Sequence, residues 1–201
     1  VSVIILSSYL LINSNDNFSL RSVFFNTISI LTGTGYVNAE FDGWGSFPLT
    51  LFLALMFVGG CAGSTTCGIK IFRIQILYLF ISNQIKKIIY PKGVFPIKYD
   101  QNSVDDKFIA SIISFIYLYF VIFFALTALL SLTGLDFITA ISGAATSISN
   151  VGPGLGPIIG PNGDFSSLPD ISKWILTIGM ILGRLELFAI LVLFLPSFWR
   201  N

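Results

Sequence analysis

The sequence predicts an all-α membrane protein with two similar units, each containing a long apolar helix, a short apolar helix, a glycine turn and a further long helix. Of its 201 residues, 54% are hydrophobic and 10% are charged, whereas a soluble domain carries about 25% charged residues. Residues 108–130 contain no charged side chain and are long enough to cross a bilayer. Two shorter apolar segments, 22–31 and 137–148, are too short to cross it and end at glycine turns. Lipid is therefore expected to surround much of the chain.

Residues 1–82 are predicted to form the first unit. Its opening helix is represented only by the apolar residues 1–12, and the chain begins without Met inside an apolar run. We therefore expect a fragment whose first helix has been cut short. The short helix 22–31 follows, with Ser22 as a candidate N-cap, and leads into a glycine turn at residues 32–36.

Residues 47–81 are predicted to form one membrane helix that is broken by a glycine-rich loop. The apolar part 47–58 cannot span a membrane alone, and residues 59–68 are rich in Gly, Ser and Thr. Irregular backbone at membrane depth is tolerated only where it is buried in protein or lines a wet cavity. This loop could act as a gate in such a cavity. Alternatively, Gly59 and Gly63 form a GxxxG pair that lets two helices pack closely.

Residues 107–201 are predicted to form the second unit. Its elements are, in order, the long helix 108–130, the short helix 137–148, the glycine turn 149–154 and the long helix 172–195. Asp136 is well placed to cap the short helix. Phe24-Phe25-Asn26-Thr27-Ile28-Ser29 in the first unit also resembles Phe137-Ile138-Thr139-Ala140-Ile141-Ser142 in the second, which supports an internal repeat.

The distribution of charge predicts an orientation in the membrane. Basic side chains dominate the stretch between the two units and the end of the chain: Lys70, Arg73, Lys86, Lys87, Lys92, Lys98, Lys107 and Arg200. Acidic side chains dominate the segments around the glycine turns: Asp16, Glu40, Asp42, Asp136, Asp164 and Asp170. By the positive-inside rule, the linker 83–106 and the C-terminus are cytoplasmic and the glycine turns open to the outside. The acids could attract cations to an outer mouth or form an ordinary solvated rim.

The glycine turns have the chemistry of a cation pathway. A dehydrated cation needs several oxygen ligands at once, and stacked backbone carbonyls supply them without formal charge. The carbonyl end of each short helix carries a partial negative charge that also favours a cation. The candidate ion-binding residues of this selectivity filter are Thr32, Gly33, Thr34, Gly35, Ser149, Asn150, Val151 and Gly152. The alternative is a pair of ordinary turns at a membrane surface.

Arg184 is predicted near the middle of the last long helix. A charge there costs at least about 2.5–3.5 kcal/mol on insertion scales, so the side chain should face a cavity or a partner. It could repel cations as an electrostatic barrier or hold the glycine-rich loop through carbonyl contacts. A salt bridge with another helix is the alternative, and the role of Glu186 stays open.

Several other classes of site are excluded or disfavoured. The chain has no His, so a His/Cys zinc site cannot form, and Cys61 and Cys67 are expected to be small buried residues. Gly63 to Gly68 has the spacing of a phosphate loop, but Ile69 stands where that loop needs Lys. The net charge of +1 gives no reason to expect a nucleic-acid partner. Tyr36, Trp44, Trp174 and Trp199 are assigned to the aromatic belts at the membrane surfaces.

The chain also resembles the C-terminal half of a TrkH-type subunit of the Trk/Ktr/HKT superfamily of potassium transporters. The matching residues are Thr32-Gly33-Thr34-Gly35-Tyr36, Gly59-Gly60-Cys61-Ala62-Gly63-Ser64-Thr65, Asn150-Val151-Gly152-Pro153-Gly154-Leu155-Gly156, Gly183-Arg184-Leu185-Glu186 and Pro196-Ser197-Phe198-Trp199-Arg200. The resemblance implies a potassium-channel-like fold of four helix–pore-loop–helix repeats, of which this chain would hold the third, truncated, and the fourth. It also implies a gate below the filter, formed by Gly59, Gly60, Gly63, Ser64, Thr65, Thr66, Gly68 and Arg184.

The resemblance further implies a multi-pass protein of the bacterial cytoplasmic (inner) membrane, with potassium as substrate and no bound cofactor. The partners it implies are membrane lipid, the missing N-terminal half of the subunit, a second copy in a homodimer and a cytoplasmic nucleotide-binding ring of TrkA type. The basic stretch 70–107 could contact that ring or could be an ordinary positive-inside loop. The expected function is potassium uptake and not enzymatic catalysis. The alternatives are a secondary carrier that binds a small solute at its broken helices and a non-transporting scaffold or sensor.

Overall fold

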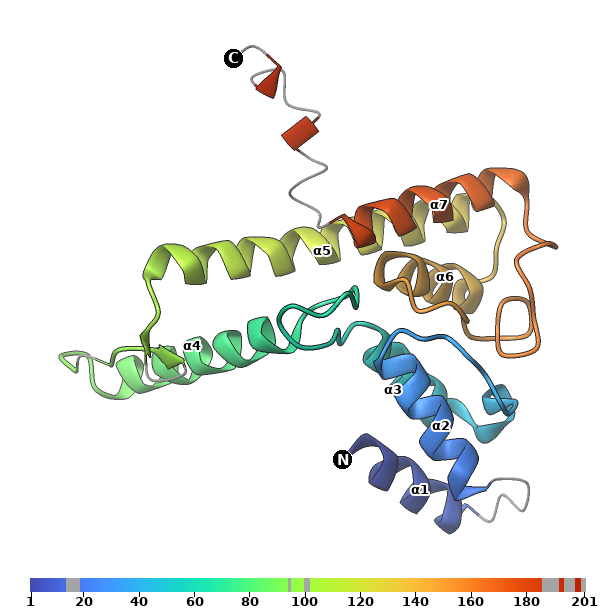
Figure 1. Cartoon of the computed structure of the whole chain (residues 1–201), viewed down its shortest axis with the longest axis horizontal. Coiled ribbons are helices and arrows are strands. Elements are labelled where there is room, and N and C mark those ends of the chain that lie inside the picture. Colours follow the sequence, from blue (N-terminus) through green and yellow to red (C-terminus); the bar gives the residue numbers. More distant parts are fainter. Residues whose placement is uncertain (14–18, 94, 100–101, 186–191, 194–197, 200–201) are drawn as a thin grey trace.

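The computed structural model describes residues 1–13, 19–93, 95–99, 102–185, 192–193 and 198–199. This part of the chain is almost entirely helical, and its single sheet pairs two strands of two residues each, β1 (Lys98–Tyr99) and β2 (Asn102–Ser103). Helix α5 (Asp106–Leu132) runs along most of the long axis of the molecule (Figure 1). Within the described ranges, α5 is the one helix long and apolar enough to cross a membrane.

The N-terminal helices form one group. They are α1 (Ser2–Ile12), α2 (Leu20–Leu31), the 3-10 helix η1 (Phe41–Trp44) and α3 (Ser46–Met56). The hydroxyl of Ser19 accepts a hydrogen bond from the Ser22 amide at 3.1 Å and caps α2. The expectation that Ser22 is the cap is therefore wrong, because Ser22 already lies in the first turn of the helix.

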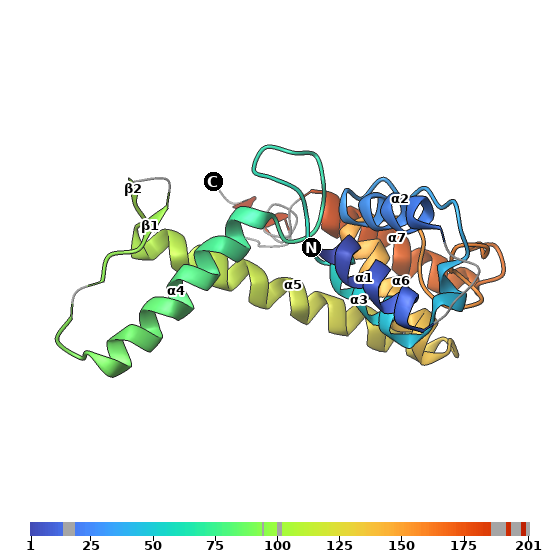
Figure 2. The same ribbon diagram turned by 90° about the horizontal axis from the view of Figure 1, so that it is seen from below.

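The polypeptide is not helical between α3 and α4 (Ile71–Ile89). We call this segment, residues 57–70, the 57–70 loop. Its two ends are tied together, since the Gly59 amide donates to the Ile69 carbonyl at 2.9 Å and the Ile69 amide donates to the Phe57 carbonyl at 2.9 Å. Gly59 and Gly63 therefore do not lie on a helix, and the helix-packing interpretation of this pair is wrong. Figure 2 shows the loop between α4 on one side and the group of α1, α2, α3, α6 and α7 on the other.

The C-terminal half is built from α5, α6 (Phe137–Ser149) and α7 (Asp170–Arg184). Asp136 Oδ2 accepts a hydrogen bond from the Thr139 amide at 3.2 Å, which confirms the expected cap of α6. Helix α7 crosses α6 where glycines allow close contact: a Cβ at Gly183 would lie 1.9 Å from the Ile148 carbonyl oxygen, and one at Gly179 would lie 2.7 Å from Ser147 Oγ. The rest of the predicted helix 172–195, including Glu186, lies largely outside the described residues.

Aromatic side chains hold the core between the two halves. Phe57, at the end of α3, packs edge-on against Tyr119 and Phe123 of α5, with ring centroids 6.2 and 5.0 Å apart. Trp44 is only 6% exposed and packs with Phe41 and Phe52. Trp44 is therefore a core residue, and its assignment to a membrane-surface belt is wrong. In contrast, Tyr36, Trp174 and Trp199 are exposed.

A smaller apolar cluster joins α4 to the start of α5 through Ile76, Ile109 and Ile112. Both cysteines are unpaired; Cys61 is exposed and Cys67 is half-buried. The expectation that both are buried is wrong, because both lie in the non-helical 57–70 loop and not on a packed helix.

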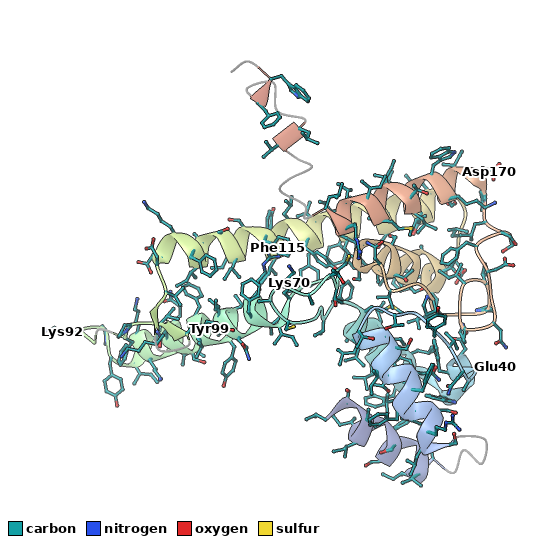
Figure 3. The ribbon with its side chains drawn as sticks, in the orientation of Figure 1. Glu40, Lys70, Lys92, Tyr99, Phe115 and Asp170 are labelled. Atoms are coloured by element: carbon teal, nitrogen blue, oxygen red, sulfur yellow. The ribbon has the colours of Figure 1, made fainter. Side chains whose placement is uncertain are left out.

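Three charged side chains mark the two ends of the long axis. Figure 3 shows Glu40 and Asp170 near one end and Lys92 at the other, with Lys70 and Phe115 between them. The end that carries Glu40 and Asp170 is also the end where the loops after the two glycine turns meet.

Candidate functional site

The first turn, residues 32–36, is fixed to the end of α2 by backbone hydrogen bonds. The amides of Thr34 and Gly35 both donate to the Ser29 carbonyl, at 3.0 and 3.4 Å. Gly33 and Gly35 have φ of 66° and 77°, a region that L-residues other than glycine seldom adopt. The hydroxyls of Thr32 and Thr34 lie 2.7 Å apart and both residues are exposed. The turn therefore presents carbonyl and hydroxyl oxygens close together.

The second turn, residues 149–154, is fixed by hydrogen bonds to three helices. Asn150 adopts a left-handed conformation with φ of 50°, and its side-chain amide donates to the Met180 carbonyl of α7 at 3.0 Å. The Gly152 amide donates to Thr146 Oγ1 at 2.9 Å. Tyr119 and Ser149 share a buried hydroxyl–hydroxyl hydrogen bond of 2.7 Å. Helices α5, α6 and α7 thus all fix this turn.

The two turns lie against each other. A Cβ on Gly35 would lie 2.2 Å from the Val151 carbonyl oxygen and 3.3 Å from Pro153 Cδ. A Cβ on Gly152 would lie 3.4 Å from Gly35 Cα. Segments more than one hundred residues apart in the sequence therefore form one site, and only glycine fits at position 35.

Thr66 brings the 57–70 loop close to this site. Thr66 Cγ2 lies 3.4 Å from where a Cβ of Gly33 would be, and Asn150 O lies 3.9 Å from the same point. Gly59 and Gly68 lie at the closed base of the loop, and Gly60 packs against the Ser64 and Thr66 hydroxyls. At Gly63, an added Cβ would have no heavy atom of a non-adjacent residue within 4 Å. All of the predicted gate residues except Arg184 therefore share one loop, and Thr66 brings that loop close to the first turn.

Arg184 connects α7 to this loop. Its Nη1 donates to the Thr65 carbonyl at 2.9 Å and lies 3.8 Å from Cys67 Sγ. Arg184 is the last residue of α7, so its expected place near the middle of a long helix is not what the structure shows. A cation suits the C-terminal turn of a helix, where the last carbonyls carry partial negative charge. The observed partner is a backbone carbonyl of the loop.

A cavity of about 230 Å³ lies beside the loop. Its lining includes three cationic side chains, Lys70, Arg73 and Arg184, together with Tyr119 and Phe115. The Arg73 guanidinium carbon lies 3.6 Å from the centroid of the Phe115 ring, within the range of a cation–π contact. This cavity therefore places positive charge beside Tyr119, which supports the second turn.

Two acidic side chains near the turns, Asp42 in η1 and Asp136 at the N-cap of α6, have shifted pKa values. Burial raises the pKa of Asp42, a hydrogen bond from the Gly156 amide partly offsets this, and the neighbouring Glu40 raises it further. Hydrogen bonding from Thr139 lowers the pKa of Asp136. In the part of the chain that the structure describes, His, Cys, Asp and Glu form no group of three or more that could hold a metal ion.

Several contacts that shape the site were not predicted from the sequence. Tyr119, Thr146 and Met180 all contact the second turn, and Asp42 contacts the loop that follows it. These contacts span between 6 and 114 residues, and no local pattern signals them. The spacing of Gly179 and Gly183 is the one signal that could have placed α7 against α6.

Comparison with known proteins gives consistent matches. The profile of the TrkH family, described as a cation transport protein, matches residues 7–201. The Trk system potassium uptake proteins TrkI and TrkH of Halomonas elongata are 46% and 39% identical to this chain, over 91% and 90% of it and 37% of each relative. The crystal structure of the potassium transporter TrkH from Vibrio parahaemolyticus matches with a TM-score of 0.86 and 32% identity, over 98% of this chain and 43% of that one. The chain thus spans less than half the length of these relatives.

Proposed function

Because this chain belongs to the TrkH family of cation transport proteins, we propose that it forms part of a protein that takes up potassium across the bacterial cytoplasmic membrane. Its relatives are named as potassium uptake proteins, and its fold is that of an all-α membrane protein. In this proposal, residues 1–82 and 107–201 are two of four pore repeats. The N-terminal half of the same subunit supplies the other two.

The first and second turns supply two walls of the selectivity filter. Carbonyl oxygens of residues 32–35 and 149–152 replace the hydration shell of the ion. The observation that carries this proposal is the direct apposition of the two turns at Gly35 and Val151. Two ordinary turns at a membrane surface, more than one hundred residues apart in sequence, would not be expected to contact each other.

The 57–70 loop and Arg184 form the gate. The hydrogen bond from Arg184 to the Thr65 carbonyl holds the loop next to the first turn, where Thr66 contacts Gly33. Arg184 also places a fixed positive charge beside the pathway, which opposes the passage of a cation. Removal of this side chain should loosen the loop and lower the electrostatic barrier together.

We infer the orientation from the excess of basic residues in the stretch 70–107. The end that carries Glu40 and Asp170 faces outward, and the linker 83–106 and the C-terminus face the cytoplasm. The basic stretch 70–107 is a candidate contact for a cytoplasmic nucleotide-binding ring, and the intact subunit forms a homodimer in this proposal. A carrier with a solute site at the midplane is not favoured, because the relatives of this chain are named as potassium uptake proteins.

Potassium-dependent growth of an uptake-deficient bacterium carrying the full-length gene tests this function. Growth of these cells at low potassium supports the proposed function. Growth that instead depends on adding a small organic solute to the medium points to a carrier of that solute. In the same cells, Arg184→Ala should raise the potassium flux about tenfold or more, since hydrogen bonds to charged groups contribute at least about 1.5 kcal/mol. Lys173→Ala, which removes a cation paired with Asp170 at the other end of α7, is the matched control. Unchanged flux in a well-expressed Arg184→Ala protein would contradict the gating role.

A further inference from the structure

An acidic side chain links the two halves of the chain just beyond the glycine turns. Asp42 follows the first turn, and its Oδ1 accepts a hydrogen bond of 3.2 Å from the amide of Gly156, which follows the second turn. The two residues are 114 positions apart in sequence. Glu40 accepts a second hydrogen bond across the same gap, from the side-chain amide of Asn162. We call these two contacts the outer latch.

The fold holds Asp42 rigidly in place for this contact. Asp42 lies in the 3-10 helix η1, between Phe41 and Trp44, which are only 0% and 6% exposed. Phe41 packs edge-on against Phe52 of α3, with centroids 4.8 Å apart. Because its neighbours are anchored in the core on both sides, Asp42 has little freedom to turn away from the opposite loop.

The opposite loop is shaped to receive the carboxylate. Gly156 has φ of 90°, and the Gly160 amide donates to the Gly156 carbonyl at 2.9 Å, so the backbone curls around the Asp42 side chain. A Cβ at Gly160 would lie 2.2 Å from Asp42 Oδ2. The space that any other residue would fill at position 160 is therefore occupied by this carboxylate.

The latch supplies polar links that the turns themselves lack. Among the hydrogen bonds of the described residues, none joins the first turn directly to the second. Their apposition at Gly35 and Val151 is a van der Waals contact, which has no preferred orientation. The hydrogen bond from the Gly156 amide to Asp42 is directional, and Gly156 lies four residues beyond Gly152.

We propose that Asp42 is a positioning residue that sets the spacing between the first and second turns and thereby the discrimination of potassium from sodium. This inference rests on the proposed role of the turns as a filter. A carbonyl-lined filter discriminates between ions by the number and placement of its oxygens. Without the outer latch, the distance between the first and second turns is no longer fixed. The filter then discriminates less between potassium and the smaller sodium ion.

The test measures the potassium-to-sodium permeability ratio of the full-length transporter from its reversal potential under bi-ionic conditions. Asp42→Ala should lower the ratio about fivefold, the effect of losing one hydrogen bond of ordinary net strength. Asp42→Asn should stay near the wild-type ratio, because its amide oxygen still accepts from Gly156. Asp164→Ala is the control for outer-surface charge, since Asp164 bonds within its own loop to Ser166.

Each outcome decides the inference. A wild-type ratio in a well-expressed Asp42→Ala protein overturns it and leaves the proposed filter intact. An equal loss in Asp164→Ala also overturns it, because surface charge would then be the cause. A wild-type transporter without potassium selectivity contradicts the proposed filter itself. If Asp42→Ala does not fold, amide hydrogen exchange of Gly156 in the wild-type protein decides: protection is expected, and exchange at the rate of a solvated amide overturns the latch.

Discussion

Substitution of Gly35 by Ser probes the contact between the two turns most sharply. Gly35 has φ of 77°, where an L-residue costs about 1–2 kcal/mol more than glycine. The new Cβ would also lie 2.2 Å from the Val151 carbonyl oxygen, against an ordinary contact of at least 3.4 Å. The two turns would have to separate by the difference, 3.4 − 2.2 = 1.2 Å, or residue 35 would have to leave the left-handed region.

Either movement displaces a carbonyl from the position it needs to bind an ion. If the strain of about 1–2 kcal/mol appears as lost discrimination, the potassium-to-sodium permeability ratio falls about 5- to 30-fold. The assay is the reversal potential of the full-length transporter under bi-ionic conditions, with the amount of protein in the membrane measured in parallel.

Gly134→Ser is the matched control for backbone strain. Gly134 has φ of 86°, close to that of Gly35, but no heavy atom lies within 4 Å of its Cβ position. The control therefore has the same conformational cost without the clash. Equal permeability ratios in the two variants would refute the reasoning, since the contact with Val151 would then have no part in selectivity.

Two further predictions concern the support of the second turn. Tyr119→Phe removes the buried hydrogen bond to Ser149 and should lower the free energy of unfolding by about 1 kcal/mol, which is measured as a lower Tm of the purified full-length protein. The control is Tyr117→Phe, because Tyr117 is exposed on the same helix. Equal Tm values for the two variants would contradict a role of Tyr119 in supporting the second turn. Asp136→Ala removes the cap of α6 and should cost about 1 kcal/mol at neutral pH. Because the pKa of Asp136 is lowered in the folded protein, the cap stabilises above the ordinary carboxyl range and is lost as the pH falls through the folded-state pKa. The stability difference between wild type and Asp136→Ala should therefore shrink in acid, and a difference that stays constant down to pH about 2 would argue against a charged cap.

Much of the local structure could be predicted from the sequence because it depends on local patterns. The uncharged segment 108–130 forms the centre of α5, and the cap at Asp136 places the start of α6. Glycine positions indicated both turns, since residues 33, 35 and 152 require conformations that other residues avoid. The break after Met56 was also predictable, because a run of Gly, Ser and Thr does not sustain a helix.

The contacts that assemble the site could not be predicted in this way. Asp42 and Gly156 are 114 residues apart, and no periodicity relates them. Trp44 was assigned to a membrane surface because it lies near the end of a predicted membrane segment, but it is buried and packs against Phe52. Ser19 and Ser22 are both able to cap α2, and only the backbone geometry distinguishes them. Tertiary packing decides such choices, and a single sequence does not record it.

In the proposed function, the two turns bind potassium through their backbone oxygens. Anomalous diffraction from crystals of the full-length protein soaked in thallium, a heavy substitute for potassium, tests this most directly. We predict thallium peaks between the turns, within bonding distance of carbonyl oxygens from residues 32–35 and 149–152. Thallium bound elsewhere in the membrane region, with none between the turns, would contradict the account.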